Sequence, residues 1–332
     1  MHCLCLARTA FTALATLLFA ASLYAQQFPA KPMRIISTTS AGGVNDTICR
    51  AFAAAISQAA GQNVIVENRP GGGSIIGMQA LAAAAPDGYT VAITTTEPLV
   101  YNPLLYVKLP YDPDRDFIPV SQLSRGGAGG IIIGSTNMPA NNFREVIVFA
   151  KANPGKLNFA TWGAGSIPAI YAAWINRQNG TDIQPIAFKG AVPSITSLLA
   201  GEVHLTYQSL GFVLPNIRAG KLKAIAIAGH KRSPHLPDVA ALAESNSDPE
   251  IESMFGVYAP GKTPPEVVAR VNAEFVRATA TAAVQKMWAT ITMEPVGSSP
   301  GEFAEAIRGA RATAARVFKA LDIRASAAPA SN

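Results

Sequence analysis

The stretch IISTTSAGGVNDTICR, residues Ile35–Arg50, begins as a β-branched run and ends as a helix. At its junction, Ala41–Gly43 carries almost no side chain, so another molecule could approach the backbone closely. We expect Asn45 or Asp46 to cap the helix, whose N-terminus then presents free N–H donors and the positive end of the helix dipole. The stretch therefore predicts a strand-turn-helix unit of an α/β protein, with a turn that can hold a carboxylate.

A second glycine turn repeats this pattern in the middle of the chain. NFATWGAGSIPAIYAAW, residues Asn158–Trp174, reads as a strand, then the turn Gly163–Gly165, then Ser166 opening a helix. Ordinary packing of a strand against a helix would also explain either turn alone. Two such turns favour a clamp on an anionic ligand.

Strand-like runs alternate with alanine-rich runs along most of the chain, which predicts parallel α/β sheets. Gly61 follows the first alanine-rich run, as expected of a residue that ends a helix. The helices that we expect include residues 47–60, 74–85, 143–152 and 194–200.

The first 25 residues read as a secretory signal peptide. Arg8 precedes an apolar run, Ala10–Ala21, and SLYAQQ offers a small-residue cleavage site after Ala25. A membrane anchor is the alternative, but this run is shorter than the roughly 20 apolar residues that cross a bilayer. We therefore expect an exported protein.

Cysteine content, length and net charge limit the kinds of protein that this chain can be. Cys49 is the only cysteine after the leader, so no internal disulfide can form. Removing 25 of the 332 residues leaves enough chain for roughly two domains of ~150 residues. The net charge of +6 is mild and its basic residues are scattered, which argues against nucleic acid as a partner.

Two glycine motifs resemble nucleotide-binding loops, and we interpret both as ordinary structure. Gly256–Thr263 matches the phosphate-loop pattern, but Pro260 lacks an N–H and the residues before it read as a strand. Arg69–Gly77 lacks the third glycine of a dinucleotide loop and favours a tight turn into a helix.

Catalytic chemistry has no clear carrier in the sequence. The histidines show no metal-ligand spacing, and no hydrolase nucleophile motif occurs. We predict no cofactor, no metal and no enzymatic activity. An exported hydrolase using Ser166 or Cys49 stays an alternative that would need a nearby base.

In ordered blocks over nearly the whole mature length, the chain resembles the solute-binding proteins of tripartite tricarboxylate transporters, the Bug family. The blocks include PMRIISTTSAGGVNDTICR, VIVENRPGGGSIIG, AAPDGYTV, NPLLYVKLPYDPDRDFIPVSQL, AKANPGKLNFAT, FKGAVPSITSLLAGEV, AGKLKAIAIAG and EPVGSSPGEF. The resemblance implies a two-domain, type II-like periplasmic binding protein that closes like a clam shell on a small carboxylate in the cleft between its domains. It implies one domain from residues 26–125 plus 253–332, a second from residues 126–252, a monomer, and delivery to the permease subunits of a membrane transporter.

The resemblance also implies where the ligand binds. With the two glycine turns, it predicts a site made of Ala41, Gly42, Gly43, Asn45, Asp46, Thr95 and Thr96 in the first domain, and of Gly163, Gly165, Ser166, Lys189 and Gly190 in the second.

The chain departs from the family pattern at several of the positions that would determine which ligand it binds. Glu97 stands where glycine is common, and Gln208 and Ser209 stand where Asp-Asn usually follows an aromatic residue. Trp162 replaces a small residue. We add these four residues to the predicted site. Glu97 could pair with an amino group or point to solvent, and Trp162 could stack on an aromatic carboxylate or pack as core.

The ligand class stays open at this point between a di- or tricarboxylate, an amino acid and an aromatic acid. A ligand-sensing adaptor of a receptor kinase is the functional alternative to a transport protein, because its cleft would obey the same physics.

Overall fold

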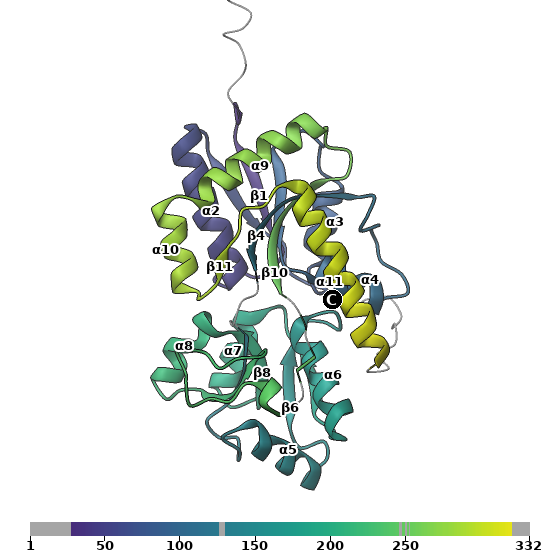
Figure 1. Ribbon diagram of the computed structural model, residues 1–332, viewed down its shortest axis with the longest axis vertical. Coiled ribbons are helices and arrows are strands. Elements are labelled where there is room, and N and C mark those ends of the chain that lie inside the picture. Colours follow the sequence, from purple (N-terminus) through teal and green to yellow (C-terminus); the bar gives the residue numbers. More distant parts are fainter. Residues whose placement is uncertain (1–27, 126–129, 246–247, 250, 252, 321–332) are drawn as a thin grey trace, which may run out of the picture.

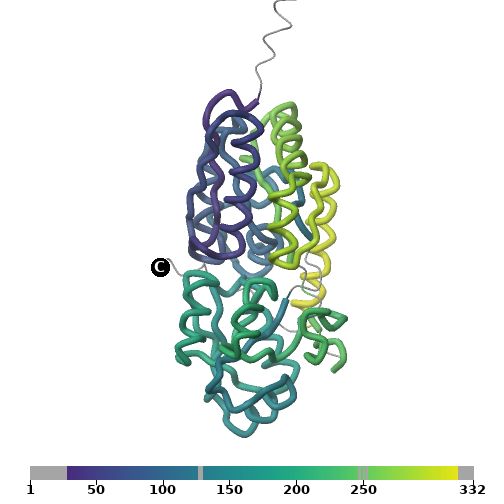
Figure 2. The backbone as a smooth tube through the Cα atoms, turned by 90° about the vertical axis from the view of Figure 1, so that its left-hand side faces the viewer, coloured from purple at the N-terminus to yellow at the C-terminus, as the bar shows by residue number. Residues whose placement is uncertain are grey.

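The computed structural model describes residues 28–125, 130–245, 248–249, 251 and 253–320. The predicted signal peptide and the glycine run at 126–129 lie outside the described residues. Two lobes stack along the long axis of the molecule (Figure 1), and the chain up to β4 and from β10 onward forms the upper lobe (Figure 2). The middle of the chain forms the lower lobe, as in a two-domain clam-shell fold.

A six-stranded sheet forms the centre of the upper lobe. Its strand order is β11 (Glu294–Pro295), β4 (Phe117–Arg125), β10 (Met254–Pro260), β3 (Thr90–Thr94), β1 (Met33–Ser37) and β2 (Val64–Asn68). The helical segments of this lobe are α2 (Val44–Ala60), α3 (Ile75–Ala82), η1 (Glu97–Tyr101), α4 (Asn102–Leu105), α9 (Pro265–Thr279), α10 (Ala282–Thr290) and α11 (Pro300–Ala320).

A five-stranded sheet forms the centre of the lower lobe. Its order is β7 (Gln184–Ala187), β6 (Asn158–Thr161), β8 (Leu205–Ser209), β5 (Gly130–Gly134) and β9 (Lys223–Ala228). Its helical segments are α5 (Phe143–Ala152), α6 (Ile167–Asn179), α7 (Ala191–Leu199), α8 (Leu210–Arg218) and η2 (Leu242–Ser245).

Both sheets are mixed, so the prediction of parallel sheets is wrong for part of each. β10 runs antiparallel to β3 and β4, and β5 runs antiparallel to β8 and β9. Gly256 near the start of β10 pairs with Thr94 at the end of β3. β10 and β5 are the first strands after the chain passes from one lobe to the other. Each therefore enters its sheet from the edge where the parallel strands end, and must run against them.

Helix α2 shows how the local sequence specifies an element of this fold. Ile48, Phe52 and Ile56 recur every fourth residue and are almost fully buried, with Cys49 beside them. The Phe52 ring stacks on Phe275 of α9, and each such buried side chain stabilises the fold by about 1.5–3 kcal/mol. Gly61, the C-cap, adopts φ 67°, a left-handed conformation that suits glycine.

The structure also shows what the match to the phosphate-loop pattern at Gly256–Thr263 forms. Residues Met254–Pro260, which overlap that match at Gly256–Pro260, form strand β10 and are buried throughout. Their backbone is committed to the sheet, so the match is accidental, as predicted. Among the described residues, no helix is both long and apolar enough to cross a membrane.

Candidate functional site

A cavity of about 110 Å³ lies where loops of both lobes meet. Its lining comes from the ends of β1, β3, β6 and β8, from the start of β10, and from the N-termini of α2, α6 and α7. Eight predicted site residues line it: Gly43, Asn45, Thr95, Glu97, Trp162, Gly190, Gln208 and Ser209. The other eight lie outside the lining: Ala41, Gly42, Asp46, Thr96, Gly163, Gly165, Ser166 and Lys189.

The first glycine turn is built differently from the prediction. Helix α2 begins at Val44 with Gly43 as its N-cap, so the prediction that Asn45 or Asp46 caps it is wrong. Both residues lie in the first helical turn instead. Gly43 has an ordinary φ of −82°, whereas Gly42 has a φ of 81°. The positive φ that this turn requires therefore lies one residue before the cavity.

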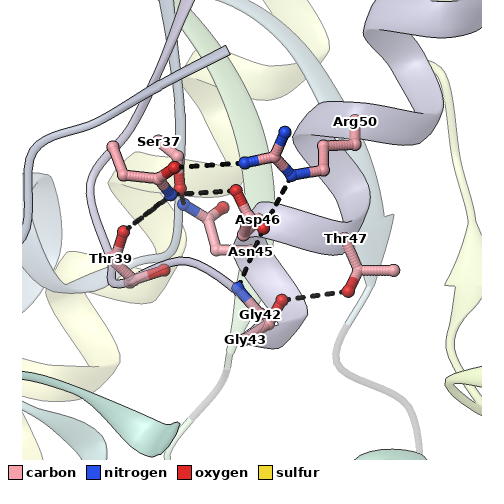
Figure 3. Close-up of polar contacts among 9 residues, drawn as sticks. Ser37, Thr39, Gly42, Gly43, Asn45, Asp46, Thr47 and Arg50 are labelled. Carbon is pink, nitrogen blue, oxygen red and sulfur yellow. Dashed lines mark hydrogen bonds and ion pairs between the residues drawn. The ribbon is translucent and has the colours of Figure 1, made fainter.

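Asp46 holds this turn from behind rather than from the cavity side. One carboxylate oxygen accepts the Gly42 N–H at 2.9 Å and the Arg50 Nε–H at 2.9 Å, and the other accepts from Asn68 (Figure 3). Burial acts to raise the pKa of Asp46, but these hydrogen bonds outweigh it and lower that pKa. The carboxylate therefore takes the Gly42 N–H, and the donors left for a ligand are those at the start of α2.

Three polar atoms of lining residues are buried without a hydrogen-bond partner. They are Asn45 Oδ1, Thr39 Oγ1 and Ser209 Oγ. The Asn45 amide is fixed because its Nδ2 donates to Ile93 O at 2.9 Å and to Ser37 Oγ at 3.2 Å. A buried polar atom without a partner costs about 1–3 kcal/mol, so a polar ligand that met these atoms would gain affinity.

Glu97 and Trp162 meet across the two lobes at the cavity. Glu97 is only 4% exposed, which excludes the solvent-facing alternative. Its carboxylate accepts hydrogen bonds from the Trp162 side chain, from the Ile167 N–H at the start of α6, and from its own backbone N–H. Burial raises the pKa of Glu97 to about 7 despite these donors. The indole of Trp162 therefore lines the cavity with its N–H already in use.

The second glycine turn joins the lobes instead of lining the cavity. Ser166 is fully buried, and its hydroxyl donates to Gly163 O at 2.7 Å and accepts from Trp162 N at 3.2 Å. A Cβ placed on Gly165 would lie 1.9 Å from Asn102 Oδ1 of the upper lobe. Gly163, Gly165 and Ser166 thus form part of the contact between the lobes. Neither glycine makes room for a ligand in the cavity.

Helix α7 brings a further N-terminus to the cavity. Gly190 is its N-cap with a φ of 143°, and an added Cβ would lie 2.9 Å from Ser40 Oγ of the upper lobe. Cβ atoms added to Gly42 and Gly43 would lie 3.9 and 4.0 Å from Val192 of α7. The N-termini of α2 and α7 therefore face each other at one end of the cavity. Lys189 is exposed beside them.

The sequence missed several lining residues. Thr39, Ser40 and Val44 flank the predicted first turn and could have been found by extending it. Phe255 and Met293 carried no local signal, because only the return of the chain to the upper sheet brings them to the cavity. The remaining lining residues are Ser74, Gly130, Ile167, Ala191, Tyr207 and Ser253.

The two candidate nucleophiles lack the setting that nucleophilic catalysis needs. Cys49 is fully buried in the upper core, and burial raises the pKa of its thiol. The Ser166 hydroxyl donates to a backbone carbonyl rather than to a base. Within the described ranges, no group of three or more His, Cys, Asp and Glu residues could hold a metal ion.

Comparison with known proteins agrees with this architecture. BugT of Bordetella pertussis is 31% identical over 291 residues, which cover 87% of this chain and 89% of that protein. The structure of the periplasmic binding protein BugD has a TM-score of 0.84 at 26% identity, covering 90% of this chain and 100% of BugD. R. palustris Rpa4515 with adipate gives 0.83 at 27% identity, with coverages of 90% and 100%.

The family comparison covers most of the chain. Residues 48–323 match the family described as the tripartite tricarboxylate transporter family receptor. That span includes both sheets except β1, and every helix described above except the first turn of α2. The fold, the cavity and these matches agree: this chain belongs to the tripartite tricarboxylate transporter receptor family.

Proposed function

We propose that this protein captures a small carboxylate in the cavity between its lobes and delivers it to the permease of a tripartite tricarboxylate transporter. The observation that carries the proposal is the pair of facing helix N-termini, α2 and α7, beside unpartnered buried polar atoms. Helix N-termini from two lobes can bind one anion only when the lobes close on it. The adipate in a structural relative supports a carboxylate as the ligand.

We further propose how the chain is exported, assembled and divided into domains. Residues 1–25 direct export to the periplasm, where the mature chain acts as a monomer without a cofactor. The domains are residues 26–125 plus 253–332 and residues 126–252, a division in keeping with the strands of each sheet. The site takes in the eight predicted residues that line the cavity.

A thermal-shift screen of carboxylates tests ligand capture. A ligand that binds only the folded protein stabilises it by about 2.7 kcal/mol at 100 times its Kd, so a true ligand raises the Tm in a concentration-dependent way. Calorimetry then confirms a single site. If no carboxylate changes the Tm and none binds by calorimetry, the proposed function is wrong.

Delivery needs a separate experiment. Uptake of the identified radiolabelled ligand by cells should stop when the gene of this protein is deleted and return when it is restored. If uptake is unchanged but ligand-dependent phosphorylation of a receptor kinase is lost, the protein is a sensing adaptor instead. Release of a new product from the ligand by the purified protein would indicate a hydrolase.

A further inference from the structure

A carboxylate of the protein itself occupies one of the three helix N-termini at the cavity. Glu97 stands at the first residue of η1 in the upper lobe and reaches the N-terminus of α6 in the lower lobe. There it accepts from the Ile167 N–H, in the first helical residue, and from the Trp162 indole. These are the interactions that a bound carboxylate would make at a helix N-terminus.

The other two N-termini converge on one place. Gly43 before α2 and Gly190 before α7 both line the cavity, and the Val192 side chain of α7 lies within 4.0 Å of a Cβ built on Gly43. Thr39 and Ser40 border the same turn and add hydroxyl groups. This end of the cavity thus offers a single set of donors to which both lobes contribute, suited to one carboxylate.

The remainder of the cavity offers no cation to a second negative charge. No described residue in its lining is a Lys, Arg or His, and its one ionisable carboxyl is Glu97. Trp162 and Ile167 contact Glu97, and Tyr207, Phe255 and Met293 add further apolar surface to the lining. A buried charge without a partner is costly, and a carboxylate close to another carboxylate is more so.

We propose that the ligand is a monocarboxylate with an apolar body, because Glu97 fills the position where a dicarboxylate would place its second group. The single ligand carboxylate binds between the N-termini of α2 and α7, and the apolar body lies against Trp162, Tyr207 and Phe255. This inference rests on the proposed function of carboxylate capture and narrows its ligand class.

Pairs of acids matched in carbon skeleton test the proposal on the unaltered mature protein. Calorimetry at pH 7.5 compares hexanoate with adipate, and benzoate with phthalate and terephthalate. Of these two sets, we take the one whose monocarboxylate binds more tightly. We expect that monocarboxylate to bind at least about tenfold more tightly than the diacids of its set, which is the loss of affinity expected when one charged group has no partner. Diacids that bind as tightly as their monoacids would overturn the proposal.

Substitution of Glu97 gives the second test. Glu97→Ala frees the Ile167 N–H and the Trp162 indole N–H, so affinity for adipate or terephthalate should rise about tenfold or more while the monoacid changes less. Glu97→Gln is the matched control. Its side-chain oxygen can still accept from both donors, so it keeps the position filled and should retain the preference for monoacids.

The two proposals fail in different ways. If neither monoacids nor diacids bind the unaltered protein or either variant, carboxylate capture itself is wrong. If carboxylates bind but Glu97→Ala leaves the ratio of monoacid to diacid affinity unchanged, only the role of Glu97 is wrong. Should Glu97→Ala fail to fold, the matched acids on the unaltered protein still decide the ligand class.

Discussion

Gly43 shows how one residue can control access to the cavity. Its ordinary φ of −82° tolerates any side chain, and a Cβ there would meet nothing closer than Ser40 O at 3.6 Å. We therefore expect Gly43→Val to abolish carboxylate binding by projecting methyl groups into the cavity, with a loss of about 1 kcal/mol or less in folding stability. Calorimetry and circular dichroism measure both effects.

Gly43→Ala is the matched control for this prediction. Alanine adds only the Cβ, so we expect it to keep the fold and to bind more weakly than the unaltered protein but more tightly than Gly43→Val. If Gly43→Val bound a carboxylate with unchanged affinity, the first glycine turn would not belong to the site.

Glu97 predicts a specific dependence of stability on pH. Its pKa is raised from an ordinary 4.5 to about 7, so between these values the folded state binds more protons than the unfolded state. The contribution of Glu97 is thus fully present below about pH 4.5 and is lost as pH rises to about 7. Tyr207 and Tyr258, the titratable groups near it, stay neutral over this range because burial raises the pKa of each.

Chemical denaturation of the unaltered protein and of Glu97→Gln at several pH values measures this contribution. We expect the free energy of unfolding of the unaltered protein, relative to that of Glu97→Gln, to fall between pH 5 and 7 and then to level off. A constant difference across this range would show that Glu97 titrates normally.

At the scale of an element, the strand-turn-helix unit at Ile35–Arg50 depends on Asp46. Its carboxylate holds Gly42, Asn68 and Arg50 together. We expect Asp46→Ala to lower the free energy of unfolding by about 1–3 kcal/mol, because three donors lose a charged acceptor, and to weaken carboxylate binding by loosening the turn. Urea denaturation and calorimetry measure the two losses.

Glu305→Ala provides the control for Asp46→Ala. Glu305 also pairs with an arginine on its own helix, but its side chain is 73% exposed. Exposed pairs contribute about 0–1 kcal/mol, so little change is expected. Equal losses in the two variants would mean that the contacts of Asp46 do not hold the turn.

The sequence predicted what is local in these elements and missed what arises between them. Glycine turns, the ends of helices and the strand that takes in Gly256–Pro260 follow from neighbouring residues, and half of the predicted site residues line the cavity. The antiparallel direction of β5 and β10 follows from where the chain crosses between lobes. Likewise, Glu97 could not be placed, because two of its donors, at Trp162 and at Ile167, belong to the other lobe and lie far along the chain.

At the scale of the whole molecule, the lobes touch through backbone as well as through side chains. The N–H groups of Ala164 and Gly165 donate to the Tyr106 hydroxyl of the upper lobe. Gly163 approaches so closely that a Cβ on it would lie 3.2 Å from Gly73 N. A contact of this kind can form only when the lobes are closed, so it couples the cavity to the shape of the molecule.

Gly165→Ala should therefore oppose closure without harming either lobe. Its added Cβ would overlap Asn102 Oδ1 in the closed form, whereas the backbone of Gly165 does not have the positive φ that would strain alanine. We expect a larger radius of gyration by small-angle X-ray scattering, and carboxylate affinity weakened about tenfold or more, since overlap of packed atoms costs about 1–3 kcal/mol. Gly309→Ala in α11, where an added Cβ meets nothing within 4 Å, should leave both values unchanged. If Gly165→Ala kept the compact shape and full affinity, Asn102 would have to move aside at little cost, and closure would not depend on this contact.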